Sequence, residues 1–189
     1  YIKCMKSLKE FSAEKGLLKP LYVFVPRAPE AFNDTFKKIE EAGLSVVRRS
    51  ESFSEDLKPK TSIDWNNIDV LLGDSFGEMY FYLKLCDHVV AGGGFWHTGA
   101  HNIIEQLQLH KPVTVGPEIW TIKFPALQAE EAGLLKVVKD PAELQGNLSL
   151  FLENNITNKI SRDKFEGFLK VYAGASNKAL AMLESKGLI

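Results

Sequence analysis

The stretch DVLLGDSFGEMYFYLKLCDHVVAG, residues 69–92, contains two short apolar runs separated by a longer segment. The runs 69–73 and 88–92 are rich in valine and leucine and each ends at a glycine, which predicts two buried β-strands. Residues 77–86 lie between them and have the length and composition of a helix. A strand, a helix and a strand in this order form the unit that connects neighbouring parallel strands.

The same alternation extends over the rest of the 189 residues. Short apolar runs predict four more strands, at 21–25, 44–49, 112–116 and 134–138. Helical patterns occupy 1–15, 29–42, 100–110, 123–133, 141–155 and a last region at 159–186, while the polar residues 50–66 predict a surface loop. Strands that are apolar throughout and separated by helices favour a parallel sheet covered on both faces. We therefore expect an α/β fold, a doubly wound Rossmann-like parallel sheet, in a single domain that spans 1–189.

Composition excludes several classes of protein. The 23 basic and 24 acidic residues give a formal net charge of −1, which does not support nucleic-acid binding. Apolar residues make up 45% of the chain, yet no run is long enough to cross a bilayer and no signal-peptide pattern is present. Cys4 and Cys86 lack metal or redox spacing and are expected to be reduced, in a soluble, cytosolic chain. Because the sequence opens directly on a helical pattern at Tyr1, we expect a fragment that has lost a preceding strand.

Unusual residues follow four of the expected strands at their carboxyl ends. In parallel α/β sheets, ligands bind outside the carboxyl ends of the strands, so these loops are candidate ligand sites. The residues concerned are Pro26 and Arg27, then Gly73, Asp74, Ser75 and Gly77, then Gly92, Gly93 and Gly94, and finally Gly116, Pro117 and Glu118.

The three glycines 92–94 expose bare backbone just before a predicted helix. Backbone N–H groups and the positive end of a helix dipole suit a phosphate. A tight turn that needs glycine torsion angles explains the same residues equally well, so both interpretations stay open.

Asn102 and Glu105 are three residues apart and are expected to project from one side of the first helical turns. A carboxylate there could accept two hydrogen bonds from a ribose diol. Alternatively, Glu105 is only an acid in the opening turn of a helix, where the dipole favours it.

Ser75 and Glu78 fit the S-x-x-E pattern of a capping box at the start of helix 77–86. The N–H groups of Phe76 and Gly77 could then also meet a ligand. Arg27 could clamp a phosphate or reach a base, or be an ordinary exposed loop residue. His97 and His101 are four apart, but no carboxylate or cysteine completes a ligand set, so we expect no metal site.

Four motifs in this order resemble the C-terminal half of 3-deoxy-D-manno-octulosonic acid (Kdo) transferases. They are VPRAPEAF (25–32), LLGDSFGEMYFYLKLCDHVVAGGGF (71–95), GAHNIIE (99–105) and KPVTVGP (111–117), and the resemblance runs from about Leu21 to Val138. It implies half of a GT-B glycosyltransferase, which has two Rossmann-like domains with the active site in the cleft between them. That family transfers Kdo from CMP-Kdo to a lipid A precursor in lipopolysaccharide synthesis, at the cytoplasmic face of the bacterial inner membrane. Transfer inverts the anomeric centre and needs neither a bound metal nor a cofactor.

The resemblance also assigns residues by motif. Arg27, Phe76, Gly77 and Glu78 match positions that contact the nucleotide, Gly93 and Gly94 match phosphate-facing glycines, and Asn102 and Glu105 match the following Asn and Glu, with Glu105 on the ribose hydroxyls. No catalytic residue is expected here, because the acceptor site, the catalytic base and the membrane anchor belong to an N-terminal domain that this chain lacks. Two alternatives stay open: the donor domain of another GT-B enzyme that uses a UDP- or GDP-sugar, and a non-catalytic flavodoxin-like module whose glycines serve turns only.

Overall fold

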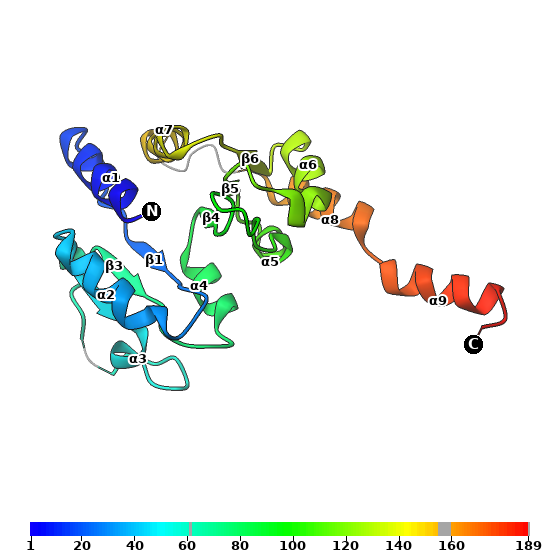
Figure 1. Ribbon diagram of the computed structural model, residues 1–189, viewed down its shortest axis with the longest axis horizontal. Helices are drawn as coiled ribbons and strands as arrows, with labels where there is room; N and C mark the ends of the chain where they lie inside the picture. The colour runs from blue at the N-terminus through cyan, green and yellow to red at the C-terminus, as the bar shows by residue number, and fades with distance from the viewer. Residues whose placement is uncertain (61, 155–159, 189) are drawn as a thin grey trace.

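The computed structural model describes residues 1–60, 62–154 and 160–188 and shows an α/β fold of short parallel strands and helices (Figure 1). Its first half contains α1 (Ile2–Glu14), β1 (Tyr22–Phe24), α2 (Ala31–Glu41), β2 (Val46–Arg48), α3 (Arg49–Ser52), η1 (Trp65–Asn67), β3 (Val70–Leu72) and α4 (Met79–Leu85). The second half contains β4 (Val89–Ala91), α5 (Ile104–Gln108), β5 (Val113–Val115), η2 (Trp120–Ile122), α6 (Lys123–Glu131), β6 (Leu135–Val137), α7 (Pro141–Glu153), α8 (Arg162–Tyr172) and α9 (Ala175–Ser185).

All six predicted strands form, but they build two parallel sheets instead of one. The first sheet has the order β1-β3-β2 and the second the order β4-β5-β6. Within the described residues, no ladder joins β1 to β4, since both strands border a cavity that keeps their edges apart. The expected α/β, Rossmann-like class is confirmed, whereas the single continuous sheet is a wrong expectation.

Each sheet has its own apolar core, centred on its middle strand. Every residue of β3 and of β5 is buried, which explains why their sequences are apolar runs without alternation. The first core adds Met5, Ile39 and Leu44, and the second adds Ile103, just before α5, and residues of α5, α6 and α8: Leu107, Ala126, Ala129, Phe165 and Phe168.

Local sequence signals set several helix ends. Gly43 and Gly133 follow α2 and α6 with φ values of +77° and +65°, the left-handed conformation that glycine adopts without strain. At the start of α7, the Asp140 side chain accepts a hydrogen bond from the Glu143 N–H (2.8 Å), and Pro141 occupies the first turn.

Three predicted segments differ from the structure. The helix expected at 100–110 is limited to Ile104–Gln108, and the loop expected at 50–66 contains the end of α3 and η1. The last helical region is divided into α8 and α9 at Gly174, whose φ is +77°. Residues 61, 155 and 159, which three of the predicted segments include, lie outside the described residues.

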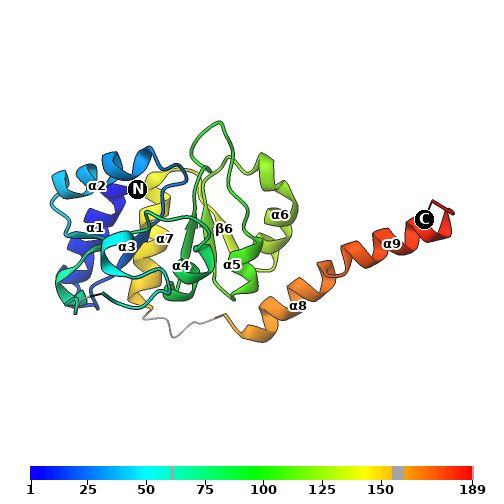
Figure 2. The same cartoon turned by 90° about the horizontal axis from the view of Figure 1, so that it is seen from below.

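The last helix, α9, extends away from the body of the molecule, as the red end of the ribbon shows from two directions (Figures 1 and 2), whereas α8 is anchored in the second core by Phe165 and Phe168. Every described side chain of α9 is exposed, so this helix adds nothing to either core. None of the helices in the described part of the chain combines the length and the hydropathy that a membrane crossing requires.

Candidate functional site

A cavity of about 1670 Å³ borders the carboxyl ends of β1 and β4 and continues between the two sheets. Six of the eight residues that the sequence assigned to ligand binding line it, and they come from the loops after three different strands. These residues are Arg27 after β1, Phe76, Gly77 and Glu78 after β3, and Asn102 and Glu105 after β4. The structure therefore brings together side chains that are up to 78 positions apart in the sequence.

Arg27 supplies positive charge at this rim, close to His101. Burial lowers the pKa of His101, and the positive charge of Arg27 lowers it further. The imidazole lies against Gly92, because a Cβ atom on that glycine would stand 3.2 Å from His101 Nδ1. An anion bound here would meet a guanidinium, an imidazole and bare backbone. The sequence analysis considered His101 only as a possible metal ligand. Its position in the loop after β4, which also carries the glycines 92–94, is the signal that could have indicated a contact with an anion.

Gly93 and Gly94 do not line the cavity, although Gly92 does. Gly94 packs backbone against backbone on the loop after β5, where its added Cβ would stand 2.7 Å from Gly116 N. Gly93 has a φ of +83°, and its added Cβ would stand 2.3 Å from Gly99 O. Tight packing thus accounts for both glycines, and their contact with a phosphate stays a prediction.

Asn102 and Glu105 both line the cavity, but they are not arranged in the way that their spacing suggested. Asn102 precedes α5, and its Oδ1 accepts a hydrogen bond from the Ile104 N–H (3.1 Å), so the two residues do not share a helical turn. Glu105 is half-buried in the first turn of α5. No side chain in the described part of the chain binds its carboxylate, which leaves both oxygens open to a pair of hydroxyl donors.

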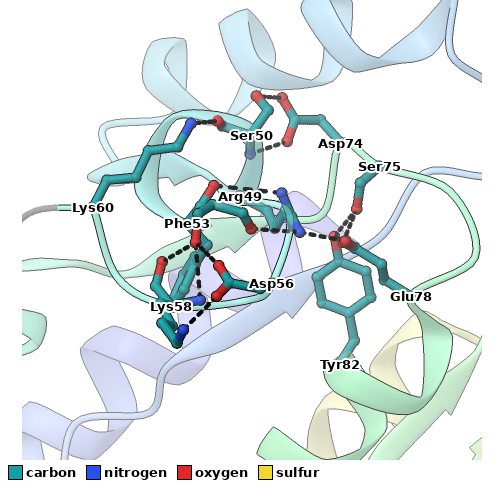
Figure 3. Close-up of polar contacts among 11 residues, drawn as sticks. Arg49, Ser50, Phe53, Asp56, Lys58, Lys60, Asp74, Ser75, Glu78 and Tyr82 are labelled. Atoms are coloured by element: carbon teal, nitrogen blue, oxygen red, sulfur yellow. Dashed lines mark hydrogen bonds and ion pairs between the residues drawn. The ribbon is translucent and has the colours of Figure 1, made fainter.

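The capping box predicted for Ser75 and Glu78 is wrong. Helix α4 begins at Met79 with Glu78 as its N-cap residue, and no side chain caps it. Instead, Glu78 forms an ion pair with Arg49, and the Ser75 hydroxyl donates to the other carboxylate oxygen (Figure 3). The carboxylate therefore joins the turn at residues 75–78 to α3, which is distant in sequence.

Arg49 is the residue that sequence reasoning missed, since it borders the segment interpreted as a surface loop. It is only 6% exposed, and its Nη2 also donates to the Ser54 carbonyl at 3.0 Å. The Tyr82 hydroxyl lies 2.5 Å from Ser75 Oγ, and burial raises the pKa of that phenol. The signal in the sequence was the pair of consecutive arginines, Arg48 and Arg49, at the end of an otherwise apolar strand.

Asp74 connects the same turn to α3 a second time. Its carboxylate accepts hydrogen bonds from the Ser50 N–H (2.9 Å) and the Ser50 hydroxyl (2.6 Å), and Arg48 Nη1 lies 3.4 Å away (Figure 3 labels Ser50 and Asp74). These contacts with α3 fix the position of the turn, while Phe76 and Gly77 in the same turn face the cavity. Phe76 is 66% exposed, so its ring is available to a ligand.

Titratable side chains elsewhere do not form an obvious metal centre. Across residues 1–60, 62–154 and 160–188, the structure groups no three His, Cys, Asp or Glu side chains so that they could hold a metal ion. The expectation that the reaction needs no metal stays a prediction.

Comparison with known proteins identifies relatives named Kdo transferase. No protein-family model matches the chain. The 3-deoxy-D-manno-octulosonic acid transferase of Bordetella pertussis is 33% identical over 167 residues, which are 88% of this chain and 37% of that protein. The enzyme of the same name from Haemophilus influenzae is 31% identical over 120 residues, 62% of this chain and 26% of that protein.

A solved structure with a similar fold supports the same comparison. It is the crystal structure of the C-terminal CMP-Kdo binding domain of WaaA from Acinetobacter baumannii, which covers 92% of this chain and 100% of its own, with a TM-score of 0.64 at 18% identity. At that identity the likeness shows the fold alone. The present chain spans about a third of the length of the curated relatives that it matches. Together these matches confirm the resemblance that the four motifs predicted: the chain is similar to part of a Kdo transferase and has the fold of a C-terminal, Rossmann-like half of such an enzyme.

Proposed function

We propose that this chain is the donor-binding domain of a Kdo transferase and holds the CMP part of CMP-Kdo at the rim of its sheets. The observation that carries the proposal is the convergence of Arg27, Phe76, Gly77, Glu78, Asn102 and Glu105 on one cavity. These residues belong to separate sequence motifs, and the fold brings the motifs to the same cavity. Loops at the carboxyl ends of parallel strands are also where such folds bind nucleotides.

The proposed contacts follow from charge and hydrogen-bonding capacity. Arg27 and His101 face the phosphate, which would favour the protonated form of His101. The free carboxylate of Glu105 accepts hydrogen bonds from the ribose 2′- and 3′-hydroxyls. Phe76 and Gly77 lie against the nucleotide, and Glu78 positions their turn through its ion pair with Arg49.

The proposal extends to the full-length protein. It would transfer Kdo from CMP-Kdo to a lipid A precursor at the cytoplasmic face of the inner membrane, with inversion at the anomeric carbon and without a bound metal or cofactor. The acceptor site and the catalytic carboxylate would lie in an N-terminal half outside residues 1–189, so this chain alone would bind donor and transfer nothing. This chain is similar to enzymes named Kdo transferase but spans only 37% of one of them. That share supports the assignment of donor binding and acceptor binding to different parts of the protein.

The test is a titration of the ¹⁵N-labelled chain with CMP up to millimolar concentration, followed by NMR. We expect shifts at the amides of Gly93, Asn102 and Glu105, with smaller effects of UDP and GDP at equal concentration. An unchanged spectrum would refute the proposal. A stronger response to UDP or GDP would instead indicate the donor domain of another GT-B enzyme. If no nucleotide binds and Glu105→Ala changes neither the spectrum nor the stability, a flavodoxin-like module becomes the better description.

A further inference from the structure

The imidazole ring of His101 lies against the backbone of Gly92 and Gly93 at the rim of the cavity. A Cβ atom on Gly92 would stand 3.2 Å from Nδ1 and 3.3 Å from Cε1, and one on Gly93 would stand 3.2 Å from Cδ2. The His101 N–H donates to the Gly92 carbonyl at 3.0 Å, which fixes the backbone from which the ring projects. The first two glycines of the run 92–94 therefore make room for an imidazole ring.

The ring of His101 lines the cavity, and neither of its nitrogens has a hydrogen-bond partner among the described residues. Arg27, on the loop after β1, lines the same cavity and makes no ion pair with a described carboxylate. Burial lowers the pKa of His101, and the positive charge of Arg27 lowers it further, whereas Glu105 and Glu118 in the neighbouring segments do not shift it. Two groups that can carry positive charge thus share the rim without an acid that balances them.

An anion at this rim changes the balance of charge around His101. It attracts the guanidinium of Arg27, offsets the repulsion between the two groups and offers oxygen acceptors to the ring, so the protonated imidazole becomes the favoured form. Binding then takes up a proton from the solvent, in the pH range in which histidine titrates. Because the pKa is higher in the bound state, the affinity for the anion must fall as the pH rises through that range.

We propose that His101 stabilises the leaving group of the transfer: protonated when the donor binds, it donates a hydrogen bond to the phosphate that the sugar releases. Because the anion is taken to be the phosphate of a CMP-sugar, the inference rests on the proposed function. In the transfer, the bond between the anomeric carbon and a phosphate oxygen breaks, and its electron pair stays on that oxygen. The acceptor hydroxyl forms the new bond to the carbon and gives its proton to the carboxylate proposed outside residues 1–189.

The phosphate gains negative charge in this step, which makes the proton on His101 more valuable at the end than at the start. The donor is a phosphodiester with one negative charge. Released CMP is a monoester, and its second charge is largely present at pH 7.5 because the second pKa of such a phosphate is about 6. A hydrogen bond from a cation becomes stronger with that charge, and interactions that strengthen toward the transition state are those that accelerate a reaction.

Calorimetric titrations of this chain with CMP and with CMP methyl ester test the inference. The methyl ester is a phosphodiester, as the donor is, and keeps one charge between pH 5.5 and 8, so the pH dependence of its binding arises in the protein. We expect its affinity to fall about 10-fold across this range, and CMP to bind about 10-fold more tightly than the ester at pH 7.5. In His101→Gln the pH dependence should disappear, and the preference for CMP should decrease at least about 3-fold.

Two further measurements separate His101 from its surroundings. His97→Gln is the matched control, because His97 is exposed in the same loop and does not line the cavity, so both affinities and their pH dependence should stay unchanged. NMR titration of the His101 ring, in the free chain and with saturating methyl ester, should show that the ester raises the pKa of the imidazole. The second measurement needs no variant and decides the question even if His101→Gln does not fold.

The outcomes distinguish this inference from the proposed function. If CMP and its ester bind but the ring pKa of His101 does not change, the inference is overturned and the proposed function stands. A pH dependence that persists in His101→Gln, or equal affinities of the parent chain for CMP and the ester, would have the same meaning. If neither ligand binds at any pH, both the inference and the proposed function are overturned.

Discussion

The guanidinium of Arg49 forms an ion pair with the carboxylate of Glu78 and so joins α3 to the turn at residues 75–78, which faces the cavity. The side chains are 7% and 19% exposed, so neither charge is well solvated by itself. Removal of one partner from such a pair leaves an uncompensated buried charge. The pair therefore stabilises the turn that carries Phe76 and Gly77.

We predict that Arg49→Met lowers the free energy of unfolding by about 3 kcal/mol in urea denaturation, because Glu78 loses its counter-ion. Lys58→Met is the matched control, since Lys58 pairs with Asp56 at a site where both side chains are more than half exposed. That substitution should change stability by less than about 0.5 kcal/mol. Equal losses in the two variants would contradict the argument from burial. The double variant Arg49→Met/Glu78→Leu should recover part of the lost stability.

For Glu105→Gln, we predict CMP binding that is roughly 10- to 100-fold weaker, because a charged acceptor is lost from the ribose site. Since no described side chain binds this carboxylate, the melting temperature should stay unchanged. Isothermal titration calorimetry and thermal unfolding measure the two effects. Glu131→Gln, at an exposed position on α6, should alter neither quantity. A variant that binds CMP as well as the parent protein would remove Glu105 from the site.

His88 is predicted to make stability depend on pH between 6.5 and 4. Its Nε2 lies 2.8 Å from Thr114 Oγ1, which in turn donates to Asn147 Oδ1 (2.8 Å), so Nε2 carries the proton. Nδ1 is buried without a hydrogen-bond partner among the described residues, and burial lowers the pKa to about 4.

The unfolded chain therefore binds a proton at His88 below pH 6.5, while the folded chain does so only near pH 4. Stability should fall as the pH is lowered through this window, by about 3 kcal/mol in total. Urea denaturation at pH 7.5, 5.5 and 4.5 measures the slope. In His88→Gln this part of the slope should be absent, and an unchanged slope would assign it to other groups.

Asp69 is predicted to make the stability of the fold depend on pH in a separate, more acidic range. Burial by itself would raise the pKa of this carboxyl, but Lys9 at 2.7 Å, the Ser45 N–H at 2.9 Å and Lys19 at 3.1 Å lower it to about 2. The stabilisation is present above the unfolded value of 3.8 and is lost as the pH falls from there toward 2. About 2 kcal/mol should disappear across that range, and acid titration followed by circular dichroism measures it. Asp69→Asn should be less stable at pH 7 and lack this transition, which a parent-like acid profile would contradict.

The strands could be predicted from sequence because their signal is local. Residues 70–72 and 113–115 are buried on both faces and are therefore apolar without interruption. Chain order then placed the loops after β1, β3 and β4 at one rim, and this was sufficient to bring Arg27 and Glu105 to the same cavity. The four family motifs added the choice of ligand, which the residue types by themselves left open.

Features that depend on distant partners could not be predicted in this way. Ser75 and Glu78 have the pattern of a capping box, yet Arg49, 29 positions earlier, pairs with the carboxylate. The side chain of Asn102 binds the Ile104 N–H, in keeping with the start of α5 at residue 104. The division into two sheets also left no trace in the sequence of β1 or β4, because an edge strand and a central strand of this length have the same composition.

The contact between Gly94 and Gly116 has a consequence for how such domains can diverge. A methyl group on either residue would stand within 2.7 Å of the other residue's backbone, so the loops after β4 and β5 are committed to hydrogen atoms at these two positions. A new ligand preference would therefore have to arise at neighbouring positions that have room to change, such as Thr98, which is exposed and lines the cavity. The contact between the two loops thus leaves no room for a side chain, whereas the residues on either side of it could change.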